Sequence, residues 1–384
     1  MSLLEYAITV LGKCVLILDS FCELADQLRP WADYEYWNFA NQPPVPGSVT
    51  VVSRQTLNSH SETIKTLAQQ SFFLPVLVNP TEGSETMKYQ CARLGLLDLM
   101  AQGKFLTVGC GDMEPQYANL WYDSYLYKPY DYDENVAECE RAQSIFTKLD
   151  KPYQFLFLNG RSRAHRKYVI EQLRDHGLLT HALWTNLDRS PVPAHTNFYG
   201  DCCNRPSEIQ LLPPQYEVKQ FKHEPHRHFE HSFVKNELFG GAWGEIYLQA
   251  DAYIDTYFSV VTETVFEYPY SLRSEKIYKP IAIGHPFVAA ASRGFYRDLQ
   301  QAGFRTFGHL IDESFDLIDN GRDRLDRLVS VVADLCQQDL AAFVVAAQEV
   351  CVYNQQHMRE MRPQIKQQFV PRFQEFIDRY HPHA

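Results

Sequence analysis

The chain has 384 residues, of which 45% are hydrophobic and 22% charged, and it carries a formal net charge of −11. This length and composition predict a folded protein of about two ordinary domains and exclude a disordered chain. The acidic balance argues against a general nucleic-acid binder, which needs a basic surface to displace counterions.

The sequence carries no signal for export or for a membrane span. Residues 1–25 lack a basic n-region and a small-residue cleavage site, and no apolar run approaches the length of a spanning helix. The nine cysteines are scattered without a C-x-x-C pair, which argues against zinc and thioredoxin-like chemistry. We therefore expect a cytoplasmic protein with reduced thiols, while a peripheral contact with a membrane stays open.

In the first part of the chain, short apolar runs alternate with helical patterns, which predicts parallel α/β units. Helices are predicted from near Ser59 and over 87–103, and strands are predicted at 12–20, 48–53, 72–80 and 105–112. Pro75 suggests that the third strand lies at an edge or carries a bulge. We assign residues 1–149 to an N-terminal Rossmann-like domain.

The same alternation continues in the second part. The predicted elements are strands at 153–160, 180–186, 251–264 and 285–291, and helices at 162–179, 274–284 and 294–303. Residues 190–230 are expected to form a long loop, and 322–380 to be helical with kinks at Pro363 and Pro371. We assign residues 150–384 to a C-terminal domain, with the last helices packing back.

Several common motifs are missing. The sequence has no G-x-G-x-x-G after the first strand, no P-loop, no G-x-S-x-G and no H-E-x-x-H. Nicotinamide binding and P-loop phosphoryl transfer lose their main support. Four histidines cluster within residues 223–231, but they show no recognised ligand spacing, so we predict no metal and no cofactor.

The stretch FLFLNGRSRAHRKYVIEQL places Arg161, Arg163 and Arg166 between a buried strand and a helix. Ligands of open α/β sheets bind at the carboxyl ends of strands, and a helix N-terminus there favours anions. Arginine has the wrong sign for the positive end of the helix dipole, so the cluster suggests a bound phosphate. A solvated basic patch is the alternative.

A second group lies in YFSVVTETVFEYPYSLRSEKIYKP. A strand delivers Glu263 to its carboxyl end, and Ser274 has the features of an N-cap for a helix that starts at Glu275. Lys276 again opposes the dipole unless an anion is close. If the two strands are neighbours, Glu263 and Glu275 would hold ribose or sugar hydroxyls while Lys276 and the arginines hold a diphosphate. The alternative is a helix start with Glu275 favouring the dipole and Lys276 in solvent.

The order of Glu263, Ser274-Glu275-Lys276 and an apolar helix ending in GHPFV resembles the donor-site motif of family 10 fucosyltransferases. FLFLNGRSRAHRKYVIEQL is similar to the strand, loop, arginine and helix that precede this motif in that family. The resemblance covers roughly residues 153–320. It implies a GT-B fold, with two Rossmann-like domains facing across a cleft and closed by a long C-terminal helix. In such a fold residues 1–149 would lie on the acceptor side, and residues 150–384 would bind the nucleotide-sugar donor.

The resemblance also implies an inverting enzyme that needs no metal to bind its donor and uses a carboxylate of the first domain as base. Glu82 is the candidate, because it follows a predicted buried strand; Glu85, Asp112 and Glu114 compete with it. We expect transfer of a hexosyl or fucosyl group from a nucleotide-diphosphate sugar, with a GDP-sugar favoured, to a glycan or another hydroxyl acceptor.

Three other functions stay open. The protein could be a non-catalytic module that binds nucleotide sugars or glycans, or an effector that modifies proteins. It could also be a transferase that uses a CMP-activated acid, whose single phosphate would need fewer basic residues.

Overall fold

The computed structural model describes the chain at residues 14–16, 49–53, 61–68, 74–79, 91–102, 106–109, 119–121, 126, 128–130, 133–160, 162–188, 208–216, 248–267 and 272–380. Contacts between residues divide the chain into two compact units. Unit 1 joins Met1–Ser124 to Pro363–Ala384, and unit 2 is Tyr125–Arg362. The domain boundary after residue 149 stays a prediction.

Unit 1 contains a parallel sheet in which the described strands follow one another in chain order, β1-β2-β3-β4-β5. The strands are β1 Cys14–Leu16, β2 Val49–Ser53, β3 Leu74–Asn79, β4 Leu106–Gly109 and β5 Asn119–Trp121. The helices α4 (Ser61–Ala68) and α6 (Leu97–Ala101) belong to the same unit. The four strands predicted here are confirmed, and β5 is an addition.

Two details of unit 1 differ from the predictions. β3 is the middle strand, so the inference of an edge from Pro75 is wrong. Pro75 aligns with Thr50 of β2, but pairing with β4 starts only at Val76, so β4 needs no N–H from the proline. The predicted helix over 87–103 is interrupted at Gly95, whose φ of 66° lies in the left-handed region.

Unit 2 contains a four-stranded parallel sheet in the order β7-β6-β8-β9. The strands are β6 Tyr153–Asn159, β7 Ala182–Asn186, β8 Thr256–Thr262 and β9 Phe287–Ala290. The chain runs from β6 outward to β7 and then returns to the other side of β6 to form β8. The order of the strands therefore reverses between β6 and β8, as in doubly wound α/β folds.

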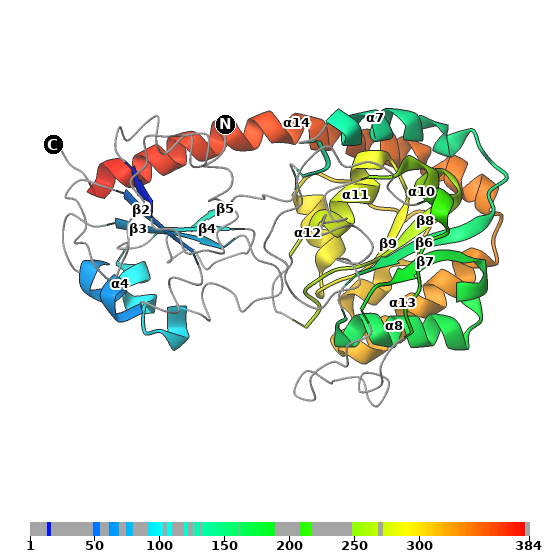
Figure 1. The fold of residues 1–384 in the computed structure, drawn as a ribbon, viewed down its shortest axis with the longest axis horizontal. Helices are drawn as coiled ribbons and strands as arrows, with labels where there is room; N and C mark the ends of the chain where they lie inside the picture. Colours follow the sequence, from blue (N-terminus) through cyan, green and yellow to red (C-terminus); the bar gives the residue numbers. More distant parts are fainter. Residues whose placement is uncertain are drawn as a thin grey trace. The chain divides into compact units, whose positions relative to one another are not determined.

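Helices cover both faces of this sheet, so unit 2 is an α/β fold of three layers (Figure 1). α8 and α13 contact each other on one side, and α10 and α11 pack against β8 on the other. The main helices are α7 Asp133–Arg141, α8 Ala164–Asp175, α10 Ala250–Ile254, α11 Glu275–Ile283, α12 Phe295–Gln301, α13 Gly321–Cys336 and α14 Leu340–Tyr380.

Aromatic side chains fill the core between the sheet and α14. Phe155 of β6 stacks on Phe258 of β8 with 5.5 Å between ring centroids, and Phe258 meets Phe343 of α14 edge-on at 6.2 Å. Phe155 and Phe258 are fully buried. Burying such a side chain contributes about 1.5–3 kcal/mol, so these rings fix the stacking of β6 and β8 on α14.

The segment 251–264 was predicted as one strand, and this is wrong for its first part. α10 ends at Ile254 and β8 begins at Thr256. The hydroxyl of Thr256 donates to the carbonyl of Ala252 at 2.8 Å, which helps to close the helix where the strand starts. The helical tail is confirmed, with a break at 337–339, and α14 continues through Pro363 and Pro371.

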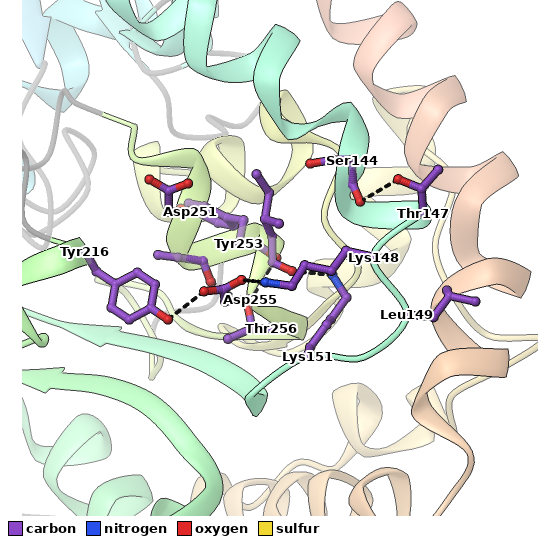
Figure 2. Close-up of polar contacts among 12 residues, drawn as sticks. Ser144, Thr147, Lys148, Leu149, Lys151, Tyr216, Asp251, Tyr253, Asp255 and Thr256 are labelled. Carbon is purple, nitrogen blue, oxygen red and sulfur yellow. Dashed lines mark hydrogen bonds and ion pairs between the residues drawn. The ribbon is translucent and has the colours of Figure 1, made fainter.

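A polar cluster joins three segments at the amino ends of β6 and β8 (Figure 2). Asp255 forms an ion pair with Lys148, and Tyr216 donates to its other oxygen at 2.7 Å. Lys151, which is 7% exposed, donates from Nζ to the carbonyl of Ile254 at 2.6 Å. The cluster ties η7 (Pro214–Tyr216) and the segment before β6 to the end of α10.

No single helix among the described residues combines the length and the apolar character needed to cross a bilayer. The bent pair formed by α13 and residues 340–361 meets these two criteria only when its members are taken together.

Candidate functional site

The candidate site lies where the strand order reverses. β6 and β8 are adjacent and parallel, so the carboxyl ends of both strands meet at one edge of the sheet. α8 follows β6 on one face, and α11 follows β8 on the other. The condition set for the predicted site, that these two strands are neighbours, is therefore met. Ligands of open α/β sheets bind in the crevice at such a reversal.

Buried polar side chains line the ends of the strands. Thr262 donates to Oδ1 of Asn159 at 2.8 Å, and Thr185 Oγ1 accepts from the backbone N–H of Asn159 at 3.0 Å. All three residues are at most 6% exposed. The side-chain nitrogen of Asn159 has no hydrogen-bond partner in the described part of the chain. A buried amide donor without a partner is costly, so this position suits a ligand or a water molecule.

The first turn of α8 has no acidic residue to offset the positive end of its dipole. Its N-cap residue is Arg163. The backbone of Arg163 is extended, and its side chain makes no capping hydrogen bond. The preceding turn is fixed by Asp188, whose carboxylate accepts from the backbone N–H of Ser162 at 2.8 Å. This helix start is half-exposed at Ser162 and Arg163 and is suited to an anion.

His165 and Arg166 turn inward from α8 towards the end of β8. Nε2 of His165 donates to the carbonyl of Glu263 at 2.8 Å, and Arg166 donates to the carbonyl of Thr262 at 3.2 Å. Both side chains are buried. Burial and the positive charge of Arg166 lower the pKa of His165 well below its ordinary value, so the ring is neutral at pH 7.

Glu263 connects β8 to the start of α11. Its carboxylate accepts from the hydroxyl of Ser274 at 2.6 Å, from the backbone N–H of Ser274 at 3.0 Å and from that of Thr264 at 3.1 Å. Glu263 and Ser274 are fully buried. Both oxygens of the carboxylate are therefore engaged within the protein.

Lys276 is the half-exposed member of this group. Ser274 is the N-cap of α11, as predicted, and its Oγ accepts from the backbone N–H of Lys276 at 3.3 Å and from its Nζ at 3.4 Å. Nζ also forms an ion pair with Glu275. The side chain of Lys276 is 18% exposed and that of Glu275 only 2%, so the ammonium group lies at the boundary between the interior and the solvent.

Comparison with family models, curated proteins and solved structures finds no match to the chain.

The structure brings six of the eight predicted site residues to one sheet edge. These are Arg163, Arg166, Glu263, Ser274, Glu275 and Lys276. Arg161 and Glu82 lie outside the described residues, as do Glu85, Asp112, Glu114 and the histidines of 223–231. The described residues contain no group of three or more potential metal ligands.

Sequence reasoning missed three residues that shape this edge: Asn159, His165 and Asp188. Asn159 could have been found, because a polar residue at the carboxyl end of a buried strand is a recognised signal for a site. His165 is the second residue of α8 and stands among basic residues, and Asp188 follows β7 by two positions. The sequence does not reveal that His165 faces the end of β8 or that Asp188 binds the backbone of Ser162.

Proposed function

We propose that this sheet edge binds the diphosphate of a nucleotide sugar, and that the protein is an inverting glycosyltransferase. The observation that carries the proposal is the meeting of two helix starts, each with a half-exposed cation, at the reversal between β6 and β8. Arg163 lies at one start and Lys276 at the other. Two such starts attract an extended anion through both their N–H groups and their cations.

The described contacts favour different roles for the predicted residues. Lys276 and Arg163, together with Arg161, would neutralise the phosphates through charge-assisted hydrogen bonds. Arg166 and Glu263 are buried and bonded to neighbouring protein groups, so we propose that they support the site without touching the donor. Glu275 forms an ion pair with the ammonium group of Lys276, so we propose that it positions this cation.

The proposed reaction is a single displacement at the anomeric carbon. A carboxylate, for which Glu82 is our candidate, takes the proton of the acceptor hydroxyl while its oxygen forms the new glycosidic bond. The bond from the anomeric carbon to the diphosphate breaks at the same time, and the nucleoside diphosphate leaves with the bonding pair. Lys276 and the arginines would stabilise the charge that develops on the leaving group.

Two parallel α/β sheets in one chain are compatible with a GT-B fold, which we include in the proposal together with the fucosyltransferase resemblance. We propose a GDP-sugar as donor, a glycan or other hydroxyl group as acceptor, and binding of the donor without a metal.

Calorimetric titration of GDP, UDP and CMP into the protein tests this function. We expect a nucleoside diphosphate to bind, and Lys276→Ala to weaken its binding at least about ten-fold, since a charge-assisted bond contributes about 1.5–3 kcal/mol. Lys279→Ala on the same helix is the matched control and should change the affinity little. Failure of all three nucleotides to bind would contradict the proposal.

Two of the alternatives give different results in the same assays. Tighter binding of CMP than of GDP or UDP would favour a transferase for CMP-activated acids. Binding of a nucleotide sugar without hydrolysis or transfer to any acceptor would favour a binding module. In the proposed enzyme, Glu82→Ala should keep nucleotide affinity and lose transfer. Loss of affinity in that variant would show that Glu82 is not the base.

A further inference from the structure

A chain of hydrogen bonds crosses the site from α8 to α11. It starts at His165, whose Nε2 donates to the backbone carbonyl of Glu263 at 2.8 Å. The carboxylate of Glu263 accepts from the hydroxyl of Ser274 at 2.6 Å. The same hydroxyl oxygen accepts from Nζ of Lys276 at 3.4 Å. The two helix starts are therefore connected through four residues.

The first three members of this chain are shielded from water. His165 is 6% exposed, and Glu263 and Ser274 are fully buried. Lys276 alone reaches the solvent, with 18% of its side chain exposed. No water is available to replace a lost partner of a buried hydrogen bond. Loss of the bond from His165 would therefore change the positions of the other groups in this series of hydrogen bonds.

The imidazole of His165 is fixed in direction as well as in place. Its ring stacks on Phe266 with 5.2 Å between centroids and an angle of 13°. The acceptor is a carbonyl oxygen, so Nε2 must carry the proton. Burial and the neighbouring cations Arg166, Arg163 and Arg324 lower the pKa of the ring, whereas its bond to the carbonyl of Glu263 raises it. The neutral ring thus acts as a donor and adds no charge.

We propose that His165 is a positioning residue, which holds the backbone of Glu263 so that Glu263 orients Ser274 and, through it, the ammonium group of Lys276. Only the last step, in which Lys276 binds an anion, rests on the function proposed above. A purely structural role for His165 would stabilise unit 2 without setting the position of Lys276.

Two substitutions separate these roles. His165→Phe keeps a ring that can stack on Phe266 but removes the donor. His165→Gln removes the ring but keeps an amide donor close to the position of Nε2. His176→Phe is the matched control, because His176 lies at the other end of α8 and is exposed.

The test follows the side-chain NMR signals of Lys276 in protein with labelled lysine, assigned by their loss in Lys276→Arg. In the unmodified protein we expect restricted motion of Lys276. His165→Phe should release it and weaken binding of inorganic pyrophosphate about ten-fold, as expected for the loss of one buried hydrogen bond. His165→Gln should restore both properties, and His176→Phe should change neither.

The outcomes keep this inference apart from the proposed function. Release of Lys276 in His165→Phe and its restoration in His165→Gln support the inference even if pyrophosphate does not bind, in which case only the proposed anion site fails. Unchanged Lys276 signals in a folded His165→Phe protein overturn the inference even if pyrophosphate binds. If that variant does not fold, the unmodified protein decides. An Nδ1–H tautomer or a charged ring in the ¹⁵N spectrum of His165, or a freely moving Lys276 in the lysine signals, overturns the inference.

Discussion

The hydroxyl of Ser274 lies 2.6 Å from Oε2 of Glu263 and also accepts from the backbone N–H of Lys276. One side chain thus caps α11 and anchors that helix to the end of β8. The hydroxyl group donates its hydrogen bond to Glu263, and its oxygen accepts one from the start of the helix. Ser274 therefore joins helix capping to the placement of the site residues.

Removing this hydroxyl should destabilise unit 2. We expect Ser274→Ala to lower the free energy of unfolding by about 2 kcal/mol, because α11 loses its cap and Glu263 loses a buried donor. Ser274→Thr keeps the hydroxyl and should cost less. Urea unfolding followed by circular dichroism measures both, and an equal loss in the two variants would contradict the role of the hydroxyl.

Glu313 should make stability fall as the pH rises from 5 to 8. Burial raises the pKa of Glu313 to about 7, so between its ordinary pKa near 4.5 and pH 7 the folded state binds more protons than the unfolded chain. This contribution is complete below the unfolded pKa and is lost as the pH passes the folded pKa, a change of about 3 kcal/mol.

Denaturant unfolding of Glu313→Gln between pH 5 and 8 checks this expectation. The amide can still accept from the backbone N–H of Phe307, as the carboxylate does at 2.6 Å, but it does not titrate. The stability of the unmodified protein relative to Glu313→Gln should fall as the pH rises. The variant keeps a pH dependence of its own, because burial raises the pKa of Asp316 to about 6 and lowers the pKa values of His165 and His285. An equal dependence on pH in the two proteins would show that Glu313 does not titrate in this range.

Lys151 should have the opposite effect at higher pH. Burial, reinforced by the charge of Lys148, lowers the pKa of Lys151 to about 8, so the folded state holds fewer protons than the unfolded chain between pH 8 and 10.5. The contribution of Lys151 to stability should therefore rise by about 1 kcal/mol between pH 8 and 9.5, while buried thiols such as Cys91, whose pKa burial raises to about 12, act in the opposite direction. Measured by thermal unfolding at each pH, the unmodified protein and Lys148→Met should both gain stability relative to Lys151→Met over this range.

Gly284 should tolerate substitution less well than Gly177. Both have left-handed φ values, 78° and 71°, so alanine costs about 1 kcal/mol of backbone strain at either. At Gly284 an added Cβ would also lie 2.8 Å from the amide group of Gln355, which donates to the carbonyl of Ala282, whereas nothing lies within 4 Å at Gly177. Urea unfolding should show a larger loss for Gly284→Ala, and equal losses would contradict the contact with Gln355.

The fold of unit 2 was predictable to the extent that apolar runs mark buried parallel strands. Tyr153–Asn159 and Phe287–Ala290 are such runs, and both form strands where they were expected. The N-cap at Ser274 was equally visible, because serine before an acidic residue and an apolar helix is a local signal. Local chemistry was sufficient in these cases.

The remaining features depend on contacts between distant residues. The chain turns from helix to strand at Asp255, where the carboxylate binds Lys148 and Tyr216 from far along the sequence. Similarly, Glu263 is a predicted site residue, but its burial against Ser274 follows from the packing of α8 and α11 around β8. A sequence pattern can place a carboxylate at the end of a strand, but it does not reveal which group will donate a hydrogen bond to that carboxylate.

The division of the chain into units has a consequence for biosynthesis. Unit 2 is one uninterrupted stretch, Tyr125–Arg362, whereas unit 1 needs Pro363–Ala384 in addition to Met1–Ser124. During translation, all residues of unit 2 are made before the last segment of unit 1. Domains usually complete their folding in order from the N-terminus. In this chain, unit 1 is the first unit to be started during translation, but its residues are complete only after those of unit 2.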